Sequence, residues 1–239
     1  MPHPWRWRLS FGQHNNIKQR DMKKTIAALS LLFAAQGAFA ADDVFTLKGE
    51  LKDFGDTVVA MIPNGFEFQR DTILVKNGKF TTTIKVDEPK DIYLVSMSTL
   101  HRKDNKQLKI VAVPGETAEL KGDAVTDYQI SGTKFYQQLG QLNRQLASTQ
   151  KELDTFTESL SKRLKAGEER SKLMDEYEAK APVYEKKIND AIFDFIKKHA
   201  SWEASAVAAV SLGKDQIEEG ISYLSNTVKN GRMKNYYQK

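Results

Sequence analysis

Short apolar runs that alternate with polar positions occupy residues 44–130 of the chain. In the first run, Phe45 and Leu47 alternate with polar residues, as the buried face of a strand does. Turn signals separate the runs. The strongest is Asn77-Gly78, because both residues tolerate the positive φ of a type I′ turn. The strands predicted in this way cover residues 44–51, 57–62, 71–75, 79–86, 92–97, 108–113, 117–120 and 128–130.

The period becomes helical after Ser131-Gly132-Thr133. A heptad-like apolar seam runs to a break at Ala166-Gly167, and a second apolar stripe ends in Lys197-Lys198-His199. Two such stripes joined by a short break predict an antiparallel helical hairpin. Pro182 lies within the second stripe, where it starts a new helix or kinks the old one. The seam consists of Phe135, Leu139, Leu142, Leu146, Leu153, Phe156 and Leu160, and the stripe of Tyr177, Ala181, Tyr184, Ile188, Ile192 and Phe195.

Shorter apolar patterns follow the hairpin. Ser201 and Asp215 are placed to cap two further short helices, and the residues after Val228 are polar without a clear period. The predicted fold class is therefore α+β: an antiparallel β-sandwich or open barrel followed by an antiparallel helical hairpin and short C-terminal helices. The predicted divisions are a sandwich domain at 41–132, a helical domain at 133–230 and a polar tail at 231–239.

A secretory signal peptide is predicted at residues 22–40. Met22-Lys23-Lys24 is a basic start, the apolar run 25–35 has the length of an h-region, and Ala38-Phe39-Ala40 has the small-x-small pattern. Cleavage is expected between Ala40 and Ala41, which predicts an exported, periplasmic protein. Residues 1–21 are interpreted as a misassigned start or an extension, because an n-region is normally only a few residues long.

The net positive charge of the 239-residue chain comes from the segment that the predicted cleavage removes. Residues 1–40 hold six basic side chains and one acidic one, and subtracting these from 36 and 31 leaves 30 and 30 for residues 41–239. A mature chain of net charge near zero gives no electrostatic reason to expect nucleic acid as a partner. We also expect no stable membrane anchor, since no later segment is apolar enough to span a bilayer.

Several motifs after residue 41 carry a resemblance to a known family through their order and spacing. They are Phe45-x-Leu47-x-Gly49-x-Leu51, Lys76-Asn77-Gly78-Lys79-Phe80, Val113-Pro114-Gly115-Glu116-Thr117, Ile130-Ser131-Gly132-Thr133 and Phe195-Ile196-x-x-His199-x-x-x-x-Ala204-Ser205-x-x-Ala208. Together they resemble a domain of unknown function that forms the N-terminal part of exported thioredoxin-like thiol–disulfide oxidoreductases of Gram-negative bacteria. The resemblance implies a β-sandwich with a helical insertion, and it covers residues 44–230.

The redox chemistry of that family depends on residues that this chain lacks. The resemblance places the family's redox cysteines in a C-terminal thioredoxin domain, and this chain contains no cysteine. It therefore has no thiolate nucleophile, disulfide or cysteine-based metal site. No catalytic residue of the family has a counterpart here, so the resemblance implies an accessory part without the redox module.

Other catalytic or ligand-binding chemistry has weak support in the sequence. His101 lies beside Arg102 and Lys103, and His199 closes a predicted helix, so neither has a second histidine at metal-ligand spacing. The acidic pairs Asp87-Glu88 and Glu168-Glu169 fall near turns or helix starts, where carboxylates are common. No catalytic, cofactor-binding or metal-binding residue is therefore assigned, and no cofactor is expected.

Three aromatic residues are candidates for a binding face. Phe66, Phe68 and Tyr93 lie in or near predicted strands, where they either line an exposed edge or pack in the core. Packing is the favoured interpretation, because aromatic side chains normally fill such cores.

Three functional hypotheses follow. The first is a non-catalytic periplasmic accessory or binding protein that contacts a protein partner or forms a homodimer, with no small-molecule ligand identified. The second is a truncated thiol–disulfide oxidoreductase that has lost its C-terminal thioredoxin domain. The third, ranked last, is a carboxylate-dependent hydrolase, since nothing in the sequence places two carboxylates across a cleft.

Overall fold

Two four-stranded sheets pack face to face in the computed structural model, which describes residues 43–123 and 127–238. One sheet, sheet A, has the strand order β4-β1-β7-β8, and the other, sheet B, has the order β3-β2-β5-β6. The predicted signal segment and its predicted cleavage site, Ala40 and Ala41, lie outside the described residues. The strands are β1 (Val44–Lys52), β2 (Thr57–Asn64), β3 (Glu67–Leu74), β4 (Lys79–Lys85), β5 (Lys90–Ser96), β6 (Gln107–Ala112), β7 (Thr117–Asp123) and β8 (Asp127–Gly132).

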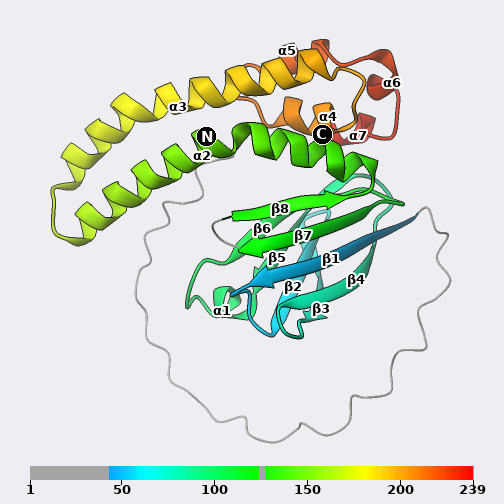
Figure 1. Ribbon diagram of the computed structural model, residues 1–239, viewed down its shortest axis with the longest axis horizontal. Coiled ribbons are helices and arrows are strands. Elements are labelled where there is room, and N and C mark those ends of the chain that lie inside the picture. The colour runs from blue at the N-terminus through cyan, green and yellow to red at the C-terminus, as the bar shows by residue number, and fades with distance from the viewer. Residues whose placement is uncertain (1–42, 124–126, 239) are drawn as a thin grey trace, which may run out of the picture.

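The α+β class is confirmed, and of the two predicted β architectures the structure adopts the sandwich (Figure 1). Most neighbouring strands are antiparallel, as expected, but β1 and β7 pair in parallel, with Leu47 opposite Ala118. The long connection between these two strands carries the chain through β4 and all of sheet B before it returns beside β1. Such a crossover permits parallel pairing, which a short hairpin does not.

The predicted Asn77-Gly78 hairpin is confirmed. Both residues have positive φ angles, 52° and 74°, and Lys76 and Lys79 exchange backbone hydrogen bonds of 2.9 Å across the turn. The β2–β3 hairpin differs from its prediction, because β2 continues through Pro63 to Asn64 and β3 begins at Glu67 rather than at Asp71. This extension places four more residues on the outer edge of sheet B.

The predicted helical hairpin is formed by α2 (Lys134–Lys165) and α3 (Arg170–Lys198), which project beyond the sandwich (Figure 1). Helix α3 continues through Pro182, so the proline does not start a new helix. In the projecting half, the ring of Phe156 stacks between Tyr177 and Tyr184, with centroids 6.4 and 6.0 Å away. At the tip, Arg163 binds Glu168 and Glu176 of the following segment.

Helix α2 covers one side of the sandwich and lies along β8 (Figure 1). Its close approach requires Gly140, since a Cβ at that position would lie 2.4 Å from the carbonyl oxygen of Ile130. The buried Tyr136, one turn earlier, donates its hydroxyl to the carbonyl of Val111 in β6 at 2.6 Å. The first turns of α2 therefore contact the edge strands of both sheets, and β3 and β4 form the opposite side.

Short helices complete the fold around the base of the hairpin. They are α4 (Ala204–Val210), α5 (Ile217–Ser222), α6 (Asn226–Lys229) and α7 (Lys234–Tyr237), and α1 (Met97–Leu100) lies between β5 and β6. The segment predicted as a polar tail includes α7 and contributes Met233, which is fully buried. Tyr236 donates its hydroxyl to Asp91 of β5 at 2.8 Å. Sparse apolar side chains thus fix this segment to the sandwich although it has no helical period.

Candidate functional site

His101 and His199 occupy unrelated positions. His101 is exposed and follows α1, whereas His199 ends α3, as predicted, and stacks on Trp202 with ring centroids 3.8 Å apart. Burial, assisted by the neighbouring Lys198, lowers the pKa of His199. Among the described residues, no group of three or more histidine or acidic side chains is arranged to hold a metal ion.

The acidic pairs take structural roles. Asp87 accepts a 2.6 Å hydrogen bond from Lys90, and this contact lowers the pKa of the Asp87 carboxyl group. Glu168 binds Arg163 through both carboxylate oxygens, at 2.8 and 2.7 Å, and Glu169 is the N-cap of α3. The structure therefore does not place Asp87-Glu88 and Glu168-Glu169 across a cleft from each other.

A charged network joins the sandwich to the helical part. Thr133, at the N-cap of α2, donates its hydroxyl to Glu116 in the turn before β7. Arg232 binds the other oxygen of Glu116, donates to both oxygens of Glu203 at 2.9 and 2.6 Å, and reaches the carbonyl of Pro114 at 3.3 Å. Two of the motifs that carry the family resemblance thus meet at this junction and stabilise it.

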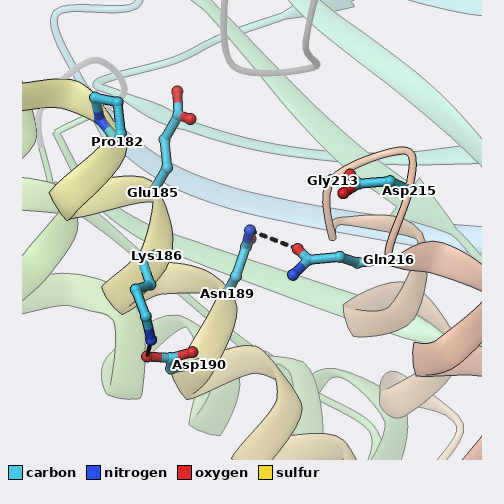
Figure 2. A pocket seen from close by; sticks show the side chains of 8 residues that line it. All are labelled: Pro182, Glu185, Lys186, Asn189, Asp190, Gly213, Asp215 and Gln216. Carbon is cyan, nitrogen blue, oxygen red and sulfur yellow. Dashed lines mark hydrogen bonds and ion pairs between the residues drawn. The ribbon is translucent and has the colours of Figure 1, made fainter. Parts of the chain in front are cut away.

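A shallow polar groove of about 410 Å³ lies between α3 and the loop before α5 (Figure 2). Across it, Asn189 donates its side-chain amide to Gln216 at 2.7 Å, while Lys186 binds Asp190 at 2.6 Å along α3. Most polar side chains that line this groove are therefore already bonded to one another. The groove has the character of a solvated helix–loop contact.

An exposed apolar surface lies on β3 and on the turn before it. Phe66, at the turn, is fully exposed, while Phe68 and Leu74 in β3 keep 47 % and 69 % of their surface accessible. The predicted packing of Phe66 and Phe68 in the core is therefore wrong. Tyr93 of β5 is half-buried and contacts Phe68 edge to face, with ring centroids 6.3 Å apart. Exposed apolar clusters of this kind mark interaction sites more often than isolated surface residues do.

The register of sheet B explains why these side chains share one face. Phe68 lies opposite Pro63, Arg70 opposite Met61, and Met61 in turn opposite Tyr93. These positions point away from the sandwich core, because Val58, Ala60 and Ile62 on the alternate positions of β2 point into it. We call Phe66, Phe68, Leu74, Met61, Pro63 and Tyr93 the β3 surface.

Comparison with known proteins finds a similarity in the sandwich and the start of α2. Residues 45–139 match the family model described as Domain of unknown function (DUF4369). This segment is similar to that domain. The match ends at Leu139, so the matched segment includes the first turns of α2 and with them Tyr136, which bonds to β6. No curated protein and no solved structure matches the chain.

The match confirms the resemblance to a domain of unknown function, for residues 45–139. The β3 surface lies wholly within the matched segment, whereas α3 and the shorter C-terminal helices lie beyond the matched residues. None of the helices in residues 43–123 and 127–238 combines the length and the apolar character needed to cross a bilayer.

Proposed function

We propose that the protein is a non-catalytic, exported binding protein that holds a polypeptide partner on the β3 surface. The observation that carries this proposal is the exposure of Phe68 and Leu74 on an edge strand and of Phe66 in the turn before it. Apolar side chains on a strand edge leave both apolar area and backbone hydrogen-bonding groups available, and polypeptides satisfy both at once.

The arrangement of the fold supports a binding role for this side of the sandwich. Helix α2 contacts the edge strands β6 and β8, and the charged network of Arg232 holds the helical part against the sandwich. The side formed by β3 and β4 lies away from these contacts (Figure 1). A partner that docks there does not need to displace the helical part.

Site-specific photocrosslinking in intact cells tests the proposal. A photoreactive phenylalanine analogue at Phe68 is expected to form a covalent adduct with a protein, recovered from the periplasmic fraction on a chain that begins at Ala41. The matched control is the same analogue at Tyr223, a 38 % exposed aromatic residue on the helical part. Equal adduct yields at the two positions, or none at Phe68, would refute the proposed binding surface.

A further inference from the structure

The outer edge of β3 presents backbone groups in a defined pattern. Val75 donates its backbone N–H to the carbonyl of Asp56 at 2.9 Å, one residue beyond the Thr57–Leu74 pair. Antiparallel pairing alternates, so every second residue of β3 directs its N–H and C=O groups away from β2. These residues are Phe68, Arg70, Thr72 and Leu74, and among the described strands only β2 pairs with β3.

The two faces of this edge differ in chemistry. Phe68 and Leu74 lie on the outer face of sheet B, together with Arg70. Glu67 and Asp71 lie on the opposite face, four residues apart on the strand. Within the described part of the chain, neither carboxylate is within ion-pair distance of a basic side chain. Asp71 accepts hydrogen bonds from the neutral side-chain amide of Gln69, at 3.2 and 3.5 Å. A strand added here therefore meets apolar groups on one face and uncompensated negative charge on the other.

This charge pattern argues against a second copy as the occupant. Suppose that β3 pairs antiparallel with β3 of a second copy, and that each face of sheet B continues into the same face of the other sheet. The two registers with the longest overlap then place the two-fold axis at Asp71 or at Arg70. Each of them places a charged side chain directly opposite its own copy, which destabilises the pair. Charged residues on strand edges commonly prevent self-association in this way.

We propose that β3 accepts an extended segment of a partner polypeptide as an additional antiparallel strand of sheet B, and that this segment alternates basic with apolar residues. The basic residues of the segment lie opposite Glu67 and Asp71, and the apolar residues lie opposite Phe68 and Leu74. Asp71, which lies opposite its own copy in one of the self-pairing registers, thus also selects the partner strand. This inference rests on the proposed function and adds the chemistry of the partner.

Synthetic peptides test the inference on the complete mature protein. The probe is a fluorescein-labelled peptide, Val-Thr-Thr-Lys-Thr-Thr-Val-Lys, and its charge-reversed counterpart carries glutamate in place of both lysines. We expect the basic peptide to bind at least tenfold more tightly in fluorescence anisotropy, and to shift the backbone amide NMR signals of Phe68, Arg70, Thr72 and Leu74. Two partly exposed ion pairs account for about a tenfold difference in affinity.

Variants of the protein supply the matched comparison. The double variant Glu67→Gln/Asp71→Asn is expected to weaken binding of the basic peptide about tenfold and to leave the charge-reversed peptide no weaker. Glu178→Gln, at an exposed position on α3, removes a carboxylate far from β3 and is expected to change neither affinity. A basic peptide that is N-methylated at alternate residues, on the amides that face β3, is expected not to bind, because strand addition requires those N–H groups.

The outcomes separate this inference from the proposed function. Equal affinity for the two peptides, no effect of the double variant, or amide shifts confined to another element would overturn the partner chemistry. If neither peptide binds while photocrosslinking at Phe68 still captures a protein, the inference fails and the proposed function stands. Crosslinking of Phe68 to a second copy of this chain also overturns the inference.

Discussion

Replacement of Arg232 by methionine is expected to destabilise the protein by about 2 kcal/mol. The guanidinium binds Glu116, whose side chain is only 13 % exposed, and Glu203, which is 34 % exposed. The more exposed pair with Glu203 contributes about 0.5 kcal/mol. Glu116 keeps only its hydroxyl contact with Thr133 in the variant, and a largely buried carboxylate without its cation costs about 1–3 kcal/mol.

Urea unfolding measures this effect. A loss of about 2 kcal/mol lowers the urea midpoint by roughly 1 M at a typical slope, and lowers Tm by about 4–8 °C in a protein of this size. A double-mutant cycle with Glu116→Gln isolates the contact, because Arg232→Met should cost about 1–2 kcal/mol less in that background. A loss below about 0.5 kcal/mol, or the same loss in both backgrounds, would show that Arg232 does not hold the two parts together.

Two further changes test the packing of α2 and the hairpin tip. Gly140→Ala is expected to lower the free energy of unfolding by about 1 kcal/mol, because the overpacking at the Ile130 carbonyl outweighs the gain in helix propensity. The control is Gln141→Ala, at an exposed position on the same helix, which should not destabilise the protein. Equal effects of the two substitutions in urea unfolding would contradict the close contact at Gly140. Arg163→Met is expected to raise the pKa of Glu168 from its lowered value toward the ordinary 4.5, as followed by carbon NMR titration. Since the folded pKa is depressed, the stabilisation by Glu168 is present above pH 4.5 and is lost as the pH falls through the lowered pKa, and an unchanged pKa in the variant would contradict this role.

Sequence patterns were sufficient to predict a strand or helix where one of its faces is buried. The strands of the core alternate clearly, Asn77-Gly78 specifies its turn, and the seams of α2 and α3 specify the helical hairpin. In each case the apolar period follows directly from the geometry of the element. The parallel pairing of β1 with β7 could not be found in this way, because nothing local distinguishes the two directions.

The sequence pattern indicated Phe66, Phe68 and Tyr93 as candidates for a binding face but favoured packing in the core, and there is a physical reason for this error. Residues 67–70 form the exposed half of an edge strand, so neither of their faces is buried and no alternation marks them. The aromatic residues there suggested packing, although only the neighbouring strands determine which face points into the core. For a similar reason the packing of the C-terminal segment was not predicted, because Met233 and Tyr236 alone are too few to produce an apolar period.

The contact between α2 and the sandwich has a consequence for how the chain can be divided. A cut at the turn after Gly132 removes Tyr136 from Val111 and exposes the backbone of β8, since α2 no longer lies along it. A strand edge uncovered in this way pairs readily with other chains, so the isolated strands would aggregate. A unit that keeps the β8 edge covered therefore ends inside a helix, and the family match likewise extends into the first turns of α2.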